Sequence, residues 1–210
     1  MKKTFVLLVL FVLPIVAYLF FASGVNNFGK LPILTESITD VTVLDEETSL
    51  KNKITILGFL GSDVNGKKGN AFNLNQKIYK RFYEFNDFQF VMISPKGTEN
   101  AVVELKKELG ALVDIKKWKF IHADEEAIAG FFSNLKTDLT LDENLGTPYV
   151  FIIDKDLNLR GRTNDEDEGT KFGFNTTSVA ELNNKMEDDV KVILAEYRLA
   201  LKKNNAERKK

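Results

Sequence analysis

Apolar residues gather in a few short runs, and the segments between them predict alternating strands and helices. The runs at 54–60, 88–94 and 149–154 are continuous, rich in β-branched and aromatic residues, and bounded by Lys, Gly or Pro. Such runs are typical of buried strands. A shorter strand is expected at 118–121, and 157–162 is expected to form a hairpin with the strand before it. Together these runs predict one central sheet.

Between the strands, apolar residues recur at helical spacing. The segment 71–85 predicts an amphipathic helix with one apolar stripe, made of Phe72, Ile78, Tyr79, Phe82 and Phe85. Thr98 is expected to cap a second helix that ends at Gly110, and a short helix is expected at 125–135. A capping box begins at Ser178 and predicts a last helix. The apolar face of that helix is Met186, Val190, Ile193, Tyr197 and Leu201.

This order of elements is that of a thioredoxin-like α/β fold, a three-layer sandwich with a mixed central sheet. In such folds the loop after the first strong strand opens a helix and holds the reactive site. Here that loop is GSDVNGKKGN, residues 61–70. The dipeptide Thr147-Pro148 precedes the run at 149–154, where thioredoxin-like proteins carry a cis-proline that faces the site.

A separate apolar segment stands at the N-terminus. Lys2 and Lys3 precede an uncharged run over 5–22, FVLLVLFVLPIVAYLFFA. Eighteen residues at the helical rise measure about 27 Å, close to the roughly 30 Å hydrocarbon core of a bilayer. We predict an uncleaved transmembrane anchor over 1–24, with the lysines on the cytoplasmic side. A cleaved signal peptide remains the alternative, because Ala22-Ser23-Gly24 resembles a small-residue cleavage site.

The remaining chain divides into a stalk with lead-in strands (25–49), the thioredoxin-like domain (50–201) and a basic tail (202–210). The tail carries a net charge of +4 and the two N-terminal lysines +2, which leaves −7 for the residues between them. Because the whole chain has a net charge of only −1, nucleic acid is not expected as a partner. The tail is interpreted as a solvated helix end, with contact to anionic lipid as the alternative.

The composition excludes several kinds of catalytic and metal-binding site. The chain contains no cysteine and one histidine, His122. Disulfides, thiol redox reactions, thiolate zinc sites and cysteine nucleophiles are therefore excluded. A single imidazole also excludes sites with several histidine ligands, and we expect no cofactor. His122 is interpreted as a structural residue at a strand end, because no G-x-S-x-G elbow presents a serine to it.

The chain resembles the SCO/SenC branch of the thioredoxin-like superfamily, membrane-anchored proteins of respiratory-oxidase assembly. The resemblance rests on the N-terminal anchor and on three segments that lie within about residues 50–200. These are ITILGFLGSDVNGKKGN, WKFIHADEEAI and YVFIIDKDLNLRGR. It implies a single-pass protein of the bacterial inner membrane with a periplasmic domain, and a protein partner at the membrane.

The chain differs from that family in the residues that carry the family's chemistry. SCO proteins carry two cysteines in the loop after the first strand, which bind copper or cycle as a disulfide; here those positions fall near Asp63 and Lys67. The family's histidine ligand lies where this chain reads Leu145-Gly146-Thr147. Carboxylate and ammonium groups do not hold Cu(I), and disulfide exchange needs a thiolate. The resemblance therefore implies a scaffold without either family activity.

The same loop has a second interpretation as a phosphate-binding loop. Gly61-x-x-x-x-Gly66-Lys67 follows a strand and precedes a helix, as a P-loop does. The next residue is Lys68 and not Ser or Thr, so the magnesium ligand is missing. A weaker alternative is anion binding by backbone N–H groups at the helix start together with the two lysines.

Two acidic segments suggest calcium ligands. The run NDEDEG at 164–169 has oxygen donors, but its twelfth position is Asn175 and not the bidentate Glu of an EF-hand. The run Asp154-Lys-Asp156-Leu-Asn158 lacks the required Gly and is interpreted as a turn. An ion-binding module on the loop 164–169 is kept as an alternative function.

We therefore expect an accessory or binding protein, possessing neither redox nor copper chemistry, and not an enzyme. An enzyme of another type that uses Asp63 or Lys67 as an acid–base group stays open. Phe172 and Phe174 are expected to tuck under the sandwich instead of forming an exposed contact. The candidate partner-binding surface is Ser62, Asp63, Asn65, Lys67, Lys68, Thr147 and Pro148.

Overall fold

Across the described residues, 2–22 and 29–207, the computed structural model places seven strands in one mixed sheet. The runs that the sequence marks as apolar form its centre: β2 (Ile54–Leu60), β3 (Phe88–Pro95) and β4 (Trp118–Ala123) are parallel. β5 (Gly146–Ile153) pairs antiparallel with β2. The short strands at the other edge are β1 (Ile33–Thr35), β6 (Leu159–Arg160) and β9 (Phe174–Asn175). The predicted hairpin of 157–162 with the preceding strand is confirmed by the β5–β6 pairing.

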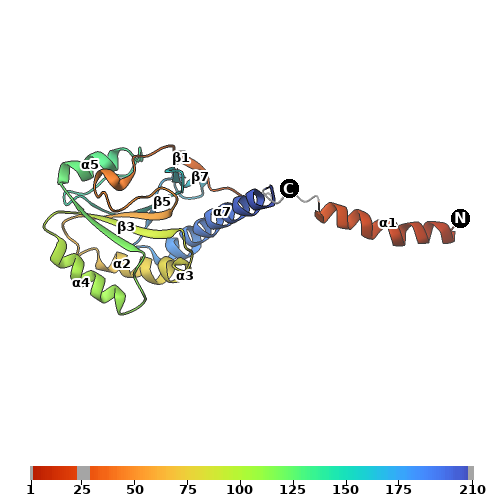
Figure 1. Ribbon diagram of the computed structural model, residues 1–210, viewed down its shortest axis with the longest axis horizontal. Helices are drawn as coiled ribbons and strands as arrows, with labels where there is room; N and C mark the ends of the chain where they lie inside the picture. The colour runs from red at the N-terminus through yellow and green to blue at the C-terminus, as the bar shows by residue number, and fades with distance from the viewer. Residues whose placement is uncertain (1, 23–28, 208–210) are drawn as a thin grey trace.

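Helices cover both faces of this sheet (Figure 1). One face carries η1 (Val41–Val43) and α5 (Glu125–Ser133). A separate hairpin, β7 (Arg162–Asp165) and β8 (Gly169–Lys171), connects β6 to β9. The opposite face carries α2 (Lys68–Leu74), η2 (Asn75–Tyr79), α3 (Lys80–Phe82), α4 (Glu99–Gly110), α6 (Val179–Glu181), η3 (Leu182–Met186) and α7 (Glu187–Glu207).

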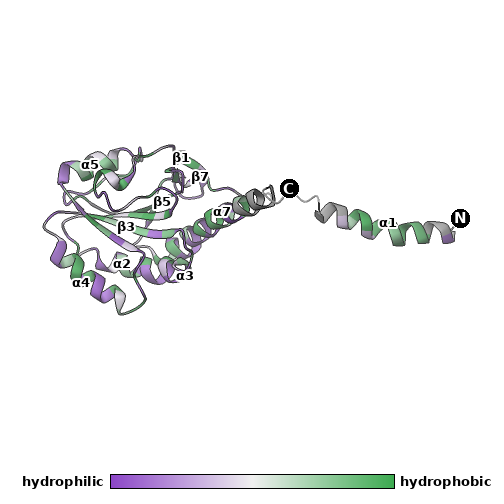
Figure 2. Cartoon of the chain, in the orientation of Figure 1, coloured by the Kyte–Doolittle hydropathy of each residue, from purple (hydrophilic) through white to green (hydrophobic). Residues whose placement is uncertain are grey.

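Strand alternation divides the core into two layers. Along β2, Ile54 and Ile56 face α2–α4 and α7, whereas Leu57 and Phe59 face α5. All four side chains are at most 2% exposed, because a strand presents successive residues to opposite faces. In Figure 2 the central strands are mainly hydrophobic, whereas α4 carries both hydrophilic and hydrophobic residues. This arrangement is the predicted three-layer sandwich.

The helix predictions are confirmed in outline and corrected at their ends. The helix predicted over 71–85 runs through α2, η2 and α3 and ends at Phe82, so Phe85 is 44% exposed and not part of the stripe. Thr98 occupies the N-cap position of α4, but its hydroxyl does not cap; it lies 2.8 Å from the Pro95 carbonyl oxygen. At the last helix, Ser178 Oγ accepts the Glu181 N–H at 3.2 Å, as the capping box predicts.

The N-terminal segment forms α1 (Lys2–Ala22), which stands apart from the domain in Figure 1. Its described side chains are Lys3 and those from Val6 to Tyr18, and most of them are exposed. Over the described residues, no helix combines the length and apolar character that crossing a membrane requires. The prediction of a transmembrane helix in 1–24 is therefore not confirmed. Leu201, predicted on the face of the last helix, lies outside the described side chains.

Candidate functional site

The candidate loop begins with a sharp turn at the end of β2. Gly61 has φ +68°, a conformation that residues with a side chain rarely adopt. A Cβ on Gly61 would lie 2.5 Å from the Asn144 carbonyl oxygen and 2.6 Å from the Gly146 nitrogen. The turn therefore lets the loop pass directly against 144–146, the segment that leads into β5.

Asp142 connects the candidate loop to the segment 144–146, which leads into β5. Its Oδ1 accepts the backbone N–H groups of Asn144 at 3.0 Å and Gly146 at 2.8 Å. Its Oδ2 lies 3.0 Å from Lys67 Nζ. Partial burial raises the pKa of Asp142, but the Gly146 N–H and the Lys67 ammonium outweigh that effect and hold the pKa below its ordinary value. A single carboxylate thus fixes both the approach to β5 and the end of the candidate loop.

The other predicted residues of the loop are also held by the chain. Ser62 donates its N–H to the Asn144 carbonyl at 2.8 Å, and its hydroxyl lies 3.1 Å from Asn144 Oδ1. Asp63 Oδ1 accepts the Gly66 N–H at 2.9 Å, which forms a turn within the loop. Asn65 is exposed at the tip of this turn. The loop is therefore an ordered surface with an exposed tip.

Lys68 lies at the first residue of α2 and is held by α4. Its Nζ is 2.8 Å from Glu108 Oε1 and 3.9 Å from Glu104 Oε2. The hydrogen bond with Glu108 raises the pKa of Lys68, against a smaller lowering by partial burial. Both lysines of the predicted anion-binding alternative thus have carboxylate partners, and α2 has only seven residues. The arrangement does not favour binding of a phosphate at this loop.

Thr147 and Pro148 lie beside the loop, as predicted, but their backbone differs from the expectation. The peptide bond before Pro148 is trans and not cis, and β5 runs through both residues. The Pro148 carbonyl accepts the Thr176 N–H at 2.9 Å and the Thr176 hydroxyl at 2.6 Å. The Pro148 carbonyl is therefore already used as an acceptor within the chain.

The space behind the loop is small. Lys67, Asn70, Thr147 and Thr176 are among the residues around a cavity of about 20 Å³. Thr147 itself is 6% exposed. A cavity of this size holds no more than a water molecule, so a ligand larger than water would contact the outer surface of the loop.

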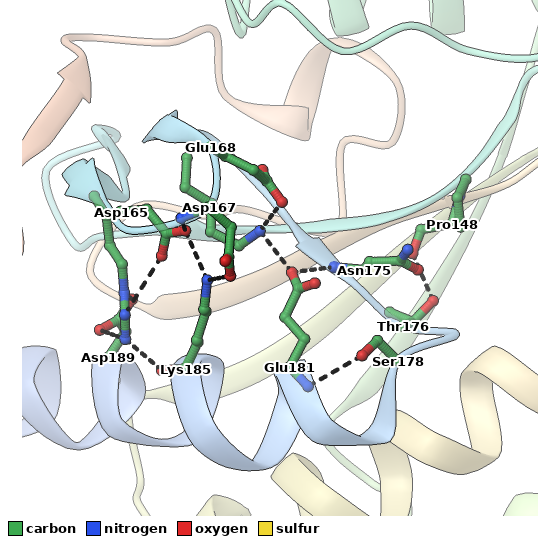
Figure 3. A network of polar contacts seen from close by, with 12 residues as sticks. Pro148, Asp165, Asp167, Glu168, Asn175, Thr176, Ser178, Glu181, Lys185 and Asp189 are labelled. Atoms are coloured by element: carbon green, nitrogen blue, oxygen red, sulfur yellow. Dashed lines mark hydrogen bonds and ion pairs between the residues drawn. The ribbon is translucent and has the colours of Figure 1, made fainter.

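The acidic loop at 164–169 is part of a charged cluster with the C-terminal helices (Figure 3). Lys185 Nζ lies 2.6 Å from Asp165 Oδ1 and 2.6 Å from Asp167 Oδ2. Hydrogen bonds to these two carboxylates raise the pKa of Lys185. Lys171, which is fully buried, pairs with Glu168 at 2.7 Å. Three of the four carboxylates in this run, those of Asp165, Asp167 and Glu168, thus pair with lysines, which does not favour the ion-binding alternative.

Glu181 connects this cluster to β5, the strand that contains Pro148. Its carboxylate lies 2.8 Å from Lys171 Nζ and accepts the Asn175 N–H at 2.8 Å. The next residue, Thr176, bonds to Pro148, so the contacts run from the hairpin to the candidate site (Figure 3). The lysines at 171 and 185 lie outside the acidic run, which is why sequence spacing alone did not indicate that it is neutralised.

His122 is a satisfied structural residue. Its Nδ1 lies 3.0 Å from Ser94 Oγ and 3.2 Å from Thr98 Oγ1. Ser94 is 1% exposed, so its hydroxyl is not presented to a substrate. The prediction for the aromatic pair is also confirmed, because Phe174 is fully buried and Phe172 packs against the core layer on the α5 face.

Two residues that hold distant segments together were not predicted from the sequence: Asp142, beside the candidate loop, and Arg160, in the edge strand β6. Asp142 carried no motif, and its role depends on the three-dimensional position of Lys67. Arg160, 3% exposed, donates to Asp154 Oδ2 at 2.8 Å, Glu196 Oε2 at 2.6 Å and the Leu31 carbonyl at 2.8 Å. The sequence did contain one indication of the role of Arg160, because it is a charged residue at an inward position of a predicted strand.

No protein-family model matches the chain, and no curated protein matches it in sequence. Solved structures do match. BsSco, described as a member of the Sco family of cytochrome c oxidase assembly proteins, aligns with a TM-score of 0.50 at 12% identity, over 78% of this chain and 97% of that one. An SCO1/SenC family lipoprotein from Bacillus anthracis aligns at 0.46 and 16% identity, over 80% and 98%.

A thioredoxin domain of a thiol-disulfide oxidoreductase from Bacteroides vulgatus aligns with a TM-score of 0.43 at 13% identity, over 77% of this chain and 95% of that one. At these identities the likeness concerns the fold. The chain therefore has a thioredoxin-like fold, which it shares with BsSco. It differs from a thiol oxidoreductase in having no cysteine anywhere in its sequence.

Proposed function

We propose that this chain is a membrane-anchored, extracytoplasmic accessory protein that binds a protein partner through the loop 62–68 and the adjacent residues Thr147 and Pro148. One observation carries the proposal. The loop that follows the first central strand is closed by the Lys67–Asp142 ion pair, with no thiol in the chain. Such a loop keeps an ordered surface while it lacks the groups that thiol exchange or Cu(I) binding requires.

The exposed groups of the loop support binding by side-chain contacts. Ser62, Asp63 and Asn65 are exposed, as are Glu143 and Asn144 in the facing segment. Strand addition at Pro148 is less favourable, since its carbonyl already accepts two hydrogen bonds from Thr176. We therefore infer a polar partner surface that recognises the loop tip.

The anchor rests on the sequence and on the exposure of α1. The run 5–22 is uncharged, and the helix that contains it has 21 residues. Leu10, Phe11 and Leu13 are each more than 60% exposed. A contiguous apolar surface of this kind is unfavourable in water and favourable in lipid. Although no helix meets the requirements for a span over the described residues, we propose from the uncharged run 5–22 that this segment lies in the membrane and that Lys2 and Lys3 stay on the cytoplasmic side.

The partner class follows from the resemblance. Because BsSco is described as belonging to a family of cytochrome c oxidase assembly proteins, we propose oxidase subunits and their assembly factors as the first partners to test. The proposed role is binding and not catalysis, and it needs no cofactor.

The test is a capture experiment with the full-length tagged chain, extracted from its native membranes in mild detergent. The site variant is Asn65→Arg/Glu143→Arg, which alters two exposed side chains at the loop tip and its facing segment. The matched control is Glu46→Arg, an exposed residue of a distant loop. Circular dichroism spectra and thermal midpoints should be unchanged in both variants.

Oxidase subunits or assembly factors captured by the wild type and the control, and lost with the site variant, would support the proposal. Equal capture by all three baits would show that the partner binds another surface of the protein. The absence of any stoichiometric partner from the wild-type bait would overturn the accessory role.

A further inference from the structure

A basic groove lies at the end of the domain opposite the candidate loop, where the parallel strands begin. It has a volume of about 370 Å³ and adjoins the starts of β2, β3 and β4. Four of its lining residues are lysines from two separate segments: Lys53 before β2, and Lys116, Lys117 and Lys119 around the start of β4. The domain as a whole is acidic, so this concentration of positive charge is local.

The charges of the groove are largely uncompensated. Among the residues that the structure describes, Lys116 alone of the four forms an ion pair, with Asp114 at 3.2 Å. Lys117 Nζ donates to the Phe85 carbonyl oxygen, a neutral acceptor. Burial lowers the pKa of Lys117, and the neighbouring positive charges of Lys116 and Lys53 lower it further, against a smaller raising effect of Asp87. Like charges held this close repel one another, and an anion in the groove would relieve that repulsion.

The acidic groups nearby are engaged or lie to one side. Asp87 pairs with Lys155. Asp45 and Glu47 line the adjoining hollow, which the groove shares only at Lys116 and Lys119. The side of the groove formed by Lys53 and Lys117 therefore faces outward as a cationic surface.

An exposed aromatic residue precedes Asn86, which lines the groove, and its carbonyl oxygen accepts from Lys117. Phe85, in the loop between α3 and β3, is 44% exposed. Phe85 lines a separate, mainly apolar cavity of about 230 Å³ with Leu194 and Tyr197 of α7, and Asn86 lines both that cavity and the groove. Aromatic and cationic side chains that lie together at a surface are typical of proteins that contact the lipid headgroup region.

The chain enters the domain near this end. The Leu31 carbonyl accepts from Arg160, and Arg160 also pairs with Glu196 of α7, one residue before Tyr197. The eight residues 23–30 separate α1 from Leu31 and span at most about 28 Å when extended. Figure 1 shows that α7 projects from the end of the domain where α3 ends, on the side of α1.

We propose that the basic groove and Phe85 rest on anionic lipid headgroups of the membrane that holds α1. This inference depends on the proposed anchor and adds an orientation: the groove faces the bilayer, so the candidate loop at the opposite end of the strands points away from it. The lysines attract the lipid phosphates, and Phe85 inserts among the headgroups. The tether keeps the domain close enough for these weak contacts to act together.

The experiment uses the full chain reconstituted into vesicles. Because the chain has no cysteine, a Glu84→Cys variant carries one fluorophore beside Phe85, and an Asn65→Cys variant carries one on the opposite loop. Vesicles of phosphatidylcholine alone, or with 30 mol% phosphatidylglycerol, contain a lipid with a nitroxide quencher on its headgroup.

We expect quenching at position 84 to be at least twofold greater with phosphatidylglycerol, and to fall in 0.5 M salt because screening weakens the attraction. Position 65 should show no such dependence. Lys53→Gln/Lys117→Gln should abolish the difference. Lys53→Gln/Lys119→Gln, which keeps the Lys117 contact with Phe85, should reduce it and guards against a folding defect.

Vesicle flotation after a carbonate wash separates the two proposals. A chain that floats but shows equal quenching at position 84 in both lipids overturns the basic-groove contact and leaves the anchor standing. A chain that does not float overturns both. If quenching is independent of phosphatidylglycerol but the lysine variants reduce capture of a protein partner, the groove binds an acidic protein and the lipid proposal is wrong.

Discussion

Lys67 Nζ lies 3.0 Å from Asp142 Oδ2 and joins two segments that are 75 residues apart in the sequence. The first segment leads from β2 into α2, and the second leads into β5. In the SCO/SenC pattern, Lys67 lies near the position of a cysteine. An ion pair thus closes the loop where that pattern provides a thiol.

The two partners of this ion pair should contribute unequally to stability. Asp142→Ala removes an ionic contact and leaves the Asn144 and Gly146 N–H groups without their acceptor, so we expect a loss of about 1–3 kcal/mol. Lys67→Met removes only a half-exposed ion pair and should cost about 0–1 kcal/mol. Urea unfolding of both variants measures the difference. Equal losses would show that Asp142 acts through the ion pair alone.

The contribution of Asp142 should depend on pH. Its pKa in the folded chain lies below the ordinary value of 3.8, because the Gly146 N–H and Lys67 favour the charged form against partial burial. A depressed carboxylate pKa stabilises the fold above the ordinary pKa and loses that effect as pH falls through the folded value. The difference in unfolding free energy between wild type and Asp142→Ala should therefore be constant from pH 7 to 5 and shrink below about pH 4. A difference that grows in acid would contradict this assignment.

Gly61 should be far less tolerant of a side chain than Gly97. Both have positive φ, +68° and +92°. An added Cβ at Gly61 would overlap the backbone of Asn144 and Gly146, whereas nothing lies within 4 Å of one at Gly97. Gly97→Ala should cost about 1 kcal/mol for the backbone conformation, and Gly61→Ala about 2 kcal/mol more for the overlap. Thermal and urea unfolding of the two variants give the comparison, and similar losses would refute the close approach.

Arg160 should be essential for the edge of the sheet that holds the incoming chain. Arg160→Met leaves the Asp154 carboxylate, 1% exposed, without its cationic partner, and should cost about 3–5 kcal/mol. Arg160→Lys should be intermediate, because an ammonium cannot reach Asp154, Glu196 and the Leu31 carbonyl together. Hydrogen exchange should speed up around residues 31–35 and 193–197 in both variants. If either variant were as stable as the wild type, the contacts of Arg160 would not be what stabilises this edge of the sheet.

Calcium should not stabilise the acidic hairpin. Asp165 and Asp167 pair with Lys185, and Glu168 pairs with Lys171, so an added cation would compete with lysines that are already in place. We expect the thermal midpoint to change by less than about 1 °C at millimolar CaCl2, since a bound ligand would raise it by mass action. MgCl2 at equal ionic strength is the control. A rise specific to calcium would restore the ion-binding alternative.

Local sequence determined the elements of this protein. Continuous apolar runs predicted β2, β3 and β5, because strands buried on both faces need apolar residues at every position. The Ser178 capping box predicted the start of the last helix, because the Ser178 hydroxyl and the Glu181 N–H are only three residues apart. The order of these elements was enough to indicate a thioredoxin-like fold, and the missing cysteines excluded thiol chemistry without any coordinates.

Tertiary structure alone decided which polar groups meet. Lys67, Arg160 and Pro148 each bond to a partner 28 to 129 residues away, and no local periodicity records such pairings. The acidic run at 164–169 suggested a cation site until Lys171 and Lys185 were placed beside it. Phe85 continued a helical stripe in the sequence but lies beyond the end of the helix. Burial of apolar surface follows from local patterns, whereas charge compensation depends on distances of a few ångströms that only the folded chain sets.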